Sequence, residues 1–545
     1  MAQSAHIDTF SQDNLPDRVH WPEILPSADT TYPARINCAV ELVDAMVDRG
    51  FADKPAVKWR EGGEIKAATY AELKALTNRI ARVLVEDLGM VPGNRILLRG
   101  PNNLMMAASW LAAIKAGLVA VATMPLLRAK ELEPVIQKAQ VSLALCDARL
   151  AEEMAHCLDA GHPQHCASLK RVVYFNSDAP DGLERMAAGK PDDFAACDTA
   201  ADDTCLIAFT SGTTGKPKGC MHFHRDVLAM CDLFPRHVLG VNQDDICCGT
   251  PPLAFTFGLG GILCFPLRVG GCAVLAEKLN PESLLQTIQD FKATIVFTAP
   301  TFYRQMAPLA RNVDLSSLRM SVSAGEALPD ATRTLWRQAT GLEMVDGIGG
   351  TEMIHVFISA SGADIRPGAI GKVVQGYQAC IVDDDLQPVA PGTPGRLAVK
   401  GPTGCRYLGD ARQTKFVQGG WNLPGDIFVQ DDEGYFYYRG RSDDMIISAG
   451  YNIAGPEVED GLLQHEAVAE CGVVGVADEQ RGQIVKAYVV LHPAYKGDDA
   501  MVKTLQDFMK QTVAPYKYPR AIEFVAALPR TETGKLKRFA LRECA

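Results

Sequence analysis

A ten-residue segment, TSGTTGKPKG from Thr210 to Gly219, concentrates hydroxyl side chains, glycines and lysines. Glycine lets the backbone approach a ligand closely, and successive N–H groups of such a loop can point at one anion. The segment therefore predicts a binding loop for a polyphosphate. It is not the phosphate loop of many ATPases, which would require Gly in place of Thr210 and Ser or Thr in place of Pro217.

The neighbouring sequence predicts the elements that hold this loop. The run at 204–210 is typical of a strand and the run at 224–234 of a helix, so we expect a strand-to-helix loop. Upstream, a helical pattern at 70–88 alternates with β-rich runs, which predicts an α/β fold with layered, largely parallel sheets. These β-rich runs are 95–100, 142–147 and 171–175.

The last third of the chain has a different pattern of predicted secondary structure. After about residue 370, short β runs separated by Gly, Pro and Asp predict a small β-barrel or sheet. From Asp443 onward the pattern returns to mixed α and β, enough for a smaller α+β C-terminal domain. Its predicted strands are 471–477, 484–492 and 521–528, and its predicted helix is 500–513.

Composition excludes several classes of protein. The 545 residues carry a formal net charge of −11, which disfavours a broad nucleic-acid surface. The polar start predicts no export signal, and the apolar run 252–267 is too short to span a membrane, so we expect a cytoplasmic protein. The 16 cysteines are predicted to be reduced core residues. The segment 156–166, HCLDAGHPQHC, could supply zinc ligands, but it matches no familiar spacing and favours a helix end and surface loop.

Together with TSGTTGKPKG, four further segments in the same order resemble the motifs of the adenylate-forming superfamily, which includes acyl-CoA synthetases. They are DGIGGTEM (346–353), WNLPGD (421–426), YRGRSDDMIISAGYNIAGPEVE (438–459) and PRTETGKLKR (529–538). The resemblance implies a two-step reaction. A carboxylate attacks the α-phosphate of ATP and releases pyrophosphate, and a thiol then attacks the acyl carbon of the adenylate.

The same resemblance assigns roles to individual residues. Glu352 would be catalytic and hold Mg²⁺, Asp426 would accept the ribose hydroxyls, Arg441 would contact ribose or phosphate, and Lys535 would be the mobile catalytic lysine. The implied ATP-binding residues are Thr210, Ser211, Gly212, Thr213, Thr214, Gly215, Lys216, Gly349, Thr351, Glu352, Asp426, Arg441 and Lys535.

The family also rotates its C-terminal domain between the two steps. The resemblance implies an N-terminal adenylation domain at 1–441 and a mobile domain at 442–545 that carries Lys535. Asp443 would then be the hinge, and Gly450 would line the tunnel for the thiol. We expect no carrier domain after residue 545, so CoA is the expected thiol. The sequence leaves a homodimer open.

Substrate signals are fewer. The stretch 251–261 has no acidic residue to hold an α-amino group, which disfavours a free amino acid. FTFGLG, SAGEALP and DGIGGTEMIHVF resemble the benzoate–CoA ligase branch, and GPTGCRYLGD is similar to 2-aminobenzoate (anthranilate) CoA ligases. Phe257, Ala324, Ile348 and His355 would form a pocket for a small aromatic carboxylic acid. For each of them core packing is the alternative interpretation.

The alternatives are a ligase for hydroxybenzoates or short aliphatic acids, and a non-catalytic nucleotide-binding module. Such a module should have lost Lys535 or Glu352, yet both are present.

Overall fold

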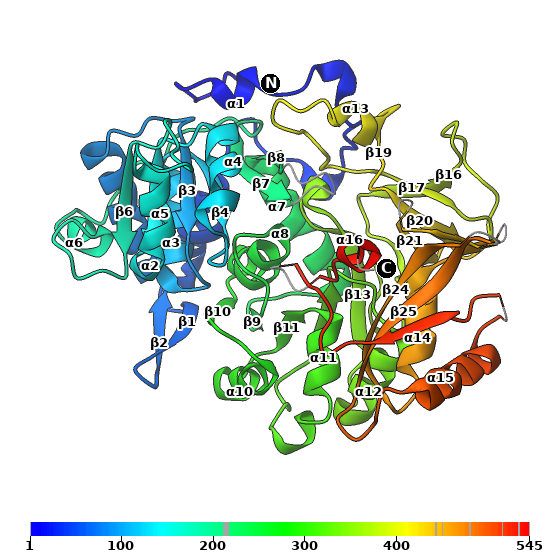
Figure 1. Cartoon of the computed structure of the whole chain (residues 1–545). Coiled ribbons are helices and arrows are strands. Elements are labelled where there is room, and N and C mark those ends of the chain that lie inside the picture. Colours follow the sequence, from blue (N-terminus) through cyan, green and yellow to red (C-terminus); the bar gives the residue numbers. More distant parts are fainter. Residues whose placement is uncertain are drawn as a thin grey trace.

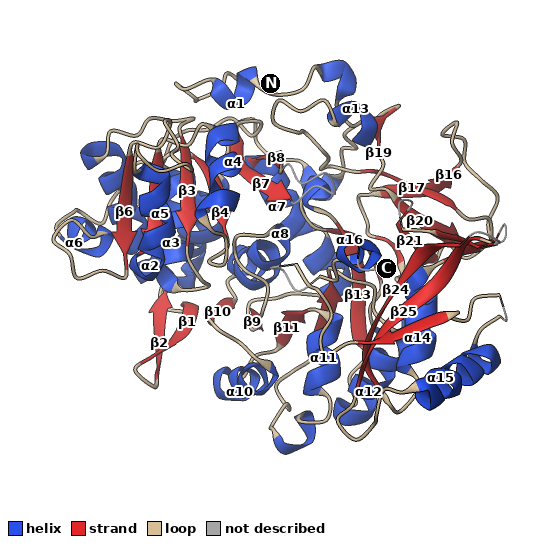
Figure 2. Ribbon diagram, viewed as in Figure 1, coloured by secondary structure: helices blue, strands red, loops and turns tan. Residues whose placement is uncertain are grey.

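The computed structural model describes residues 2–210, 217–441, 444–448, 451–478, 481–514, 516–531 and 535–543, apart from the side chain of Asn452. Helices and strands alternate through most of the chain, and the strands after residue 445 form a sheet of their own (Figures 1 and 2). The α/β fold predicted from the sequence is confirmed.

The first α/β layer is a six-stranded sheet in the order β6-β5-β3-β4-β7-β8, parallel except for β8. Every residue of β3 and β5 is buried, as expected for strands covered by helices on both faces. The strands are β3 (Arg95–Arg99), β4 (Val119–Thr123), β5 (Leu143–Asp147), β6 (Arg171–Phe175), β7 (Thr204–Thr210) and β8 (Lys218–Phe223).

The structure corrects one expectation at this sheet. The glycine-rich segment joins the antiparallel strands β7 and β8, and its last two residues, Lys218 and Gly219, already belong to β8. It is therefore a strand-to-strand connection, and the helix starts only at His224. The short run of β8 had no alternation strong enough to separate it from the helical pattern that follows.

The second layer is a nine-stranded sheet in the order β15-β14-β13-β12-β11-β9-β10-β1-β2, whose central strands from β13 to β1 are parallel. Its strands are β1 (Pro55–Glu61), β2 (Glu64–Thr69), β9 (Ile246–Gly249), β10 (Cys272–Leu275), β11 (Ile295–Thr298), β12 (Met320–Ala324), β13 (Met344–Gly349), β14 (Val356–Ser359) and β15 (Lys372–Val373).

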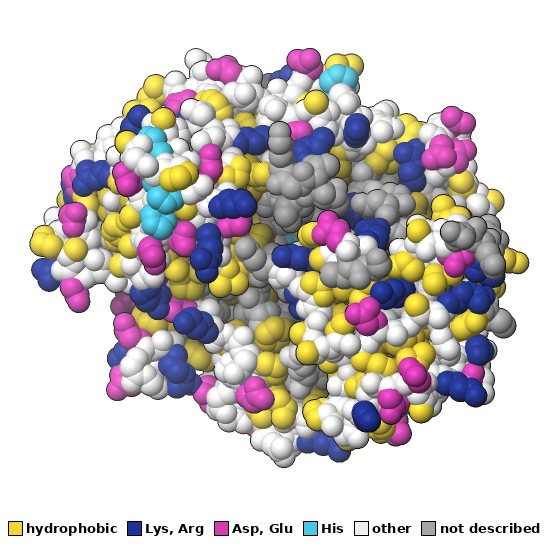
Figure 3. Space-filling model, viewed as in Figure 1, with side chains coloured by type: hydrophobic (Ala, Val, Ile, Leu, Met, Phe, Trp, Pro, Cys, Tyr) yellow, Lys and Arg dark blue, Asp and Glu magenta, His cyan; other side chains and the backbone are white. Residues whose placement is uncertain are grey.

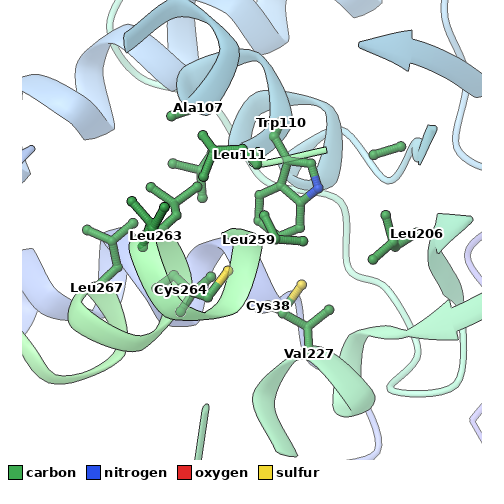
Figure 4. Close-up of a cluster of buried hydrophobic side chains, with 14 of the residues drawn as sticks. Cys38, Ala107, Trp110, Leu111, Leu206, Val227, Leu259, Leu263, Cys264 and Leu267 are labelled. Atoms are coloured by element: carbon green, nitrogen blue, oxygen red, sulfur yellow. The ribbon is translucent and has the colours of Figure 1, made fainter. Parts of the chain in front are cut away.

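The main core lies where helices of the two layers meet. Helix α3 (Leu104–Lys115) is capped by Asn103, whose side chain accepts a hydrogen bond from the N–H of Met106, and it buries Trp110 and Leu111. Figure 4 shows these side chains facing those of Leu259 and Leu263 from the apolar run 252–267. That run forms buried helical turns, which confirms its interpretation as core. No described helix is long and apolar enough to cross a membrane.

The other helices cover the sheets or follow the strands. They are α1 (Phe10–Asp13), α2 (Tyr70–Arg82), α4 (Ala129–Ala139), α5 (Ala151–Leu158), α6 (Leu183–Ala188), α7 (His224–Asp232), α8 (Thr256–Gly258), α9 (Phe265–Val269), α10 (Pro281–Phe291), α11 (Pro300–Met306), α12 (Asp330–Thr340) and α13 (Gln413–Phe416). Helix α5 ends where the segment 156–166 leaves for a loop, and the rings of His156 and His162 are stacked there at 4.2 Å. The cysteines in the described ranges form no disulfide.

The turn-rich segment is an antiparallel sheet in the order β18-β19-β17-β20-β21, with β16 paired to β17. This matches the predicted small β-rich unit. Its strands are β16 (Gln378–Val382), β17 (Gly395–Lys400), β18 (Val417–Gln418), β19 (Trp421–Asn422), β20 (Asp426–Gln430) and β21 (Phe436–Arg441).

The final sheet has the order β23-β22-β25-β24, with β26 parallel to β25. Its own core includes Val458, Val473, Val489 and Leu505. The predicted strands are confirmed, although β26 is shorter than expected. The elements are β22 (Ile446–Ser448), β23 (Tyr451–Ile453), β24 (Val468–Asp478), β25 (Gly482–Leu491), β26 (Ala521–Phe524), α14 (Gly455–Leu463), α15 (Asp499–Thr512) and α16 (Arg538–Glu543).

We call residues 444–543 the C-terminal unit and the rest the large unit. In Figure 1 the C-terminal unit, in orange and red, lies beside the end of the second layer that contains α11 and α12. Contacts between α12 and α14 and between α14 and β21 agree with that view. On the face drawn in Figure 3, basic and acidic side chains are interspersed.

Candidate active site

Several of the predicted residues come from the carboxyl ends of parallel strands. Thr210 ends β7, Ala324 ends β12, and Ile348 and Gly349 end β13. In open α/β sheets this edge is the usual place for a ligand. The short 3₁₀ turn at Thr351–Met353 contacts β7, so the Thr210 strand and the Glu352 turn are neighbours although they come from different sheets.

Thr210 is the described end of the predicted phosphate loop. Its hydroxyl oxygen is buried and has no hydrogen-bond partner among the described residues. A buried hydroxyl without a partner is costly, so this group suits a ligand that accepts a hydrogen bond from it. Ser211, Gly212, Thr213, Thr214, Gly215 and Lys216 lie outside the described residues.

Glu352 lies in a polar cluster that the sequence did not predict. Its Oε1 atom accepts a hydrogen bond from the Tyr407 hydroxyl at 2.5 Å and another from the Lys218 ammonium at 3.3 Å. Lys218 also donates to Tyr407 at 2.8 Å. The glutamate side chain is only 12% exposed. Two donors therefore hold one carboxylate oxygen, and within the described residues both act on Oε1, which leaves Oε2 for a ligand.

The backbone on both sides of Glu352 is closely packed. A Cβ atom on Gly349 would lie 2.5 Å from the carbonyl oxygen of His355, so only glycine fits there. The carbonyl of Thr351 lies 2.7 Å from the Nε2 atom of buried His222, a hydrogen bond across two sheets. His222 belongs to no motif, and Tyr407 lies in GPTGCRYLGD, a segment whose resemblance to 2-aminobenzoate CoA ligases assigns no role to single residues. Lys218 lies in the glycine-rich segment, so the second lysine of that segment was the sequence signal that could have identified it.

Asp426 and Arg441 are brought together by strand pairing. They are directly opposite each other on β20 and β21, and the Asp426 carboxylate lies 3.7 Å from the Arg441 guanidinium. Arg441 also donates to the carbonyl of Pro424 at 3.3 Å. Asp426 is nearly buried whereas the Arg441 side chain is 43% exposed, so a cation and a carboxylate are offered side by side to a polar ligand. Asp443 lies outside the described residues, as does Gly450.

Lys535 is held in a short loop that reaches the large unit. Its main-chain N–H donates to the Thr531 hydroxyl at 3.0 Å, and the N–H of Thr531 donates to the Lys535 carbonyl at 2.7 Å. The Lys535 side chain passes Gly325, because a Cβ atom built on that glycine would lie 3.7 Å from the lysine Cε. Gly325 directly follows β12, so Lys535 reaches the same strand edge as Ala324.

The four predicted pocket residues come from adjoining elements. Ala324 and Gly347 are register partners on β12 and β13, which puts Ile348 on the neighbouring strand. The ring centroids of Phe257 and His355 are 5.6 Å apart. Phe257 and Ile348 are only partly buried, so both can face a ligand, whereas His355 is 3% exposed.

His355 lies in an aromatic cluster that extends the prediction. Phe234 and Phe265 lie 5.6 Å and 4.6 Å from it, and a Cβ atom on Gly260 would be 2.6 Å from its Cδ2. Burial lowers the pKa of His355 to about 3, so its ring is neutral near pH 7. Within the described residues neither ring nitrogen makes a hydrogen bond of normal geometry.

A second group of potential metal ligands lies away from these residues. Among the described residues, Cys38, Cys205 and His224 have ligand atoms within 4.8 Å of one another. All three are fully buried, and His224 Nδ1 already accepts the main-chain N–H of Cys38 at 3.2 Å. We interpret this group as core.

Comparisons with known proteins agree with this arrangement. The family model described as AMP-binding enzyme matches residues 45–407, and the model of the AMP-binding enzyme C-terminal domain matches 457–535. A benzoate–CoA ligase of Thauera aromatica is 35% identical, with 94% of this chain and 96% of that protein covered. A 3-hydroxybenzoate–CoA ligase of Aromatoleum sp. (strain CIB) is 32% identical, with 93% and 97% covered.

Among solved structures, an anthranilate CoA ligase in complex with anthranoyl-AMP is 33% identical, with a TM-score of 0.88 and coverage of 95% of this chain and 99% of that one. The match of the first family model alone extends over more than half of the 545 residues. The chain therefore belongs to the AMP-binding enzymes, the adenylate-forming superfamily, within the branch of the benzoate–CoA ligases.

Proposed function

We propose that the protein is an ATP- and Mg²⁺-dependent aromatic acid–CoA ligase. In the first step the aryl carboxylate attacks the α-phosphate of ATP, and pyrophosphate leaves. In the second step the CoA thiol attacks the acyl carbon, AMP leaves, and the thiol proton is released. The observation that carries this proposal is the approach of Lys535 to Gly325, because it brings a cation from the C-terminal unit to the strand edge that bears Ala324.

The nucleotide would bind along that edge. Thr210 and the following residues to Lys216, with Gly349 and Thr351, would hold the phosphates. Asp426 would accept the ribose hydroxyls with its two carboxylate oxygens while Arg441 contacts ribose or phosphate. Lys535 would lie against the α-phosphate and the attacking carboxylate, where a fixed positive charge stabilises the charge that develops.

The Oε2 atom of Glu352 is a suitable ligand for Mg²⁺. This ion prefers oxygen ligands and is usually held by one or two carboxylates together with substrate phosphates. Glu352 has one oxygen engaged by Tyr407 and Lys218, and Oε2 is the atom we assign to the metal. When bound, the ion would neutralise part of the phosphate charge.

An aromatic substrate is supported by the four side chains predicted for the acid pocket. Phe257, Ile348 and Ala324 offer apolar surface, and His355 is neutral, so none of these four side chains provides a charge for a second ionised group. The relatives named for benzoate, 3-hydroxybenzoate and anthranilate support a single-ring acid. We propose benzoate or 2-aminobenzoate as the substrate, with hydroxybenzoates and short aliphatic acids as the alternative.

The test is CoA-dependent AMP formation by the purified protein with ATP and Mg²⁺. The panel would contain benzoate, 2-aminobenzoate, 2-, 3- and 4-hydroxybenzoate, hexanoate and phenylalanine. Preference for one benzoate would support the ring-sized pocket and identify the substrate. Preference for hexanoate would refute the aromatic assignment, and pyrophosphate exchange that needs no acid would refute the ligase itself.

The domain boundary at residue 441, the rotation about Asp443 and the tunnel at Gly450 stay predictions. The same holds for a cytoplasmic location, a homodimer and a role in aromatic degradation. CoA is the proposed thiol because the relatives are CoA ligases.

A further inference from the structure

One arginine links the loop of Lys535 to both units. Arg530 begins this loop, and an isolated β-bridge pairs it with Leu536 on the other side of Lys535. Its guanidinium lies 2.7 Å from the carboxylate of Glu470 on β24 and 3.4 Å from that of Glu326, which directly follows Gly325 in the large unit. Arg530 therefore contacts both glutamates and also forms one side of the β-bridge at the start of the Lys535 loop.

Glu326 is a mostly buried carboxylate at the contact between the two units. Its side chain is 18% exposed, and burial raises the pKa of its carboxyl group, an effect that Arg530 and Lys535 oppose. A buried carboxylate is costly unless it is paired. Glu326 is therefore best satisfied when the C-terminal unit brings these cations to it, which makes the arrangement with Lys535 at Gly325 favourable.

A second contact between the units works differently. Arg304 on α11 donates to the carbonyls of Leu463, Val468 and Ala469, at 3.2, 3.0 and 3.1 Å. These are main-chain acceptors at the start of β24 and the end of α14, far along the chain from Lys535. Arg304 therefore holds the C-terminal unit as a body, whereas Arg530 acts on the lysine loop.

We propose that Arg530 is a positioning residue whose bridge from Glu470 to Glu326 holds Lys535 in place for adenylation. The inference rests on the proposed role of Lys535. It requires Arg530 to matter for the first half-reaction and not for the second. Arg530 need not touch either substrate.

The experiment measures the two half-reactions separately in the full-length protein. Adenylation is followed as single-turnover pyrophosphate release without CoA, and thiol transfer as thioester formation from synthetic aryl-adenylate and CoA. Arg530→Gln and Glu326→Gln should each slow adenylation by about 10- to 100-fold, since small misplacement of a catalytic group can cost about 100-fold. Thiol transfer should stay within about twofold.

Two further variants separate positioning from folding. The double variant Arg530→Gln/Glu326→Gln should be no slower than the worse single variant, because both changes break one contact. Arg530→Lys keeps a cation and should recover part of the adenylation rate. The matched control is Lys486→Gln, which breaks the 3.0 Å ion pair with Glu523 between β25 and β26 and should leave both half-reactions unchanged.

Equal slowing of both half-reactions, or normal adenylation in Arg530→Gln, would overturn the inference. Additive losses in the double variant would do the same. Failure of the proposed function is a separate result, because the wild-type protein would then form no aryl-adenylate from any acid. If Lys535→Ala is impaired and Arg530→Gln is not, only the positioning role is wrong.

Discussion

Replacing Tyr407 with Phe tests how Glu352 is prepared for its ligand. Burial, with the charge of Glu352 as the next cause, raises the pKa of the Tyr407 hydroxyl far above its ordinary value, so the phenol remains a donor. Tyr407→Phe removes the 2.5 Å hydrogen bond to Oε1 and leaves the Lys218 contact at 3.3 Å. The ring itself is 1% exposed and its packing is kept.

A hydrogen bond to a charged acceptor contributes about 1.5–3 kcal/mol. If that energy orients Glu352 during adenylation, the rate should fall by about 10- to 150-fold, since about 1.4 kcal/mol corresponds to a factor of ten. Part of the loss should be recovered at higher Mg²⁺, because the mispositioned carboxylate would bind the ion less well. The measurement is pyrophosphate release as a function of Mg²⁺ concentration, together with thermal unfolding.

The matched control is Tyr437→Phe, which removes a 3.0 Å hydrogen bond to Asp431 in the antiparallel sheet. That variant should keep the wild-type dependence on Mg²⁺. If Tyr407→Phe lowered only the unfolding temperature, with the same rate and Mg²⁺ dependence as the control, the hydrogen bond would be structural and our reasoning about Glu352 would be refuted.

Three further predictions concern other parts of the site. Lys535→Ala should slow adenylation by about 100- to 1000-fold, as for loss of one preorganised charge donor; normal pyrophosphate release would contradict its role. Gly260→Ala puts a Cβ atom 2.6 Å from the ring of His355, so the KM for the aryl acid should rise about 10-fold while that for ATP is unchanged; steady-state kinetics with each substrate varied decide this. Burial raises the pKa of Asp346 to about 7, so between about pH 4 and pH 7 the folded protein keeps a proton that the unfolded chain has lost, and the free energy of unfolding falls as pH rises, by up to about 4 kcal/mol. Asp346→Asn should remove that part of the pH dependence. Denaturant unfolding at pH 5 and pH 7 measures it, and the reasoning is wrong if the difference in the free energy of unfolding between the two pH values is the same in the variant as in the wild type.

Local pattern was enough to predict many of the elements. The buried strands β3 and β5, the helix at α15 and the long strands β24 and β25 follow from residue type and periodicity over a few neighbours. The prediction of a strand-to-helix loop after β7 was wrong because β8 has only six residues, too few to distinguish its period from that of the helix after it.

The motifs also determined the family and the candidate residues, because each motif is contiguous in the chain. The tertiary structure alone decided which side chains meet. Lys218, Glu352 and Tyr407 are separated by 134 and 55 residues and form one cluster, and Arg530 reaches Glu326 across 204 residues. Such contacts depend on how two sheets and the C-terminal unit pack together. No local pattern in the sequence records that packing, so the donors that hold Glu352 and the bridge beside Lys535 became visible only in the folded chain.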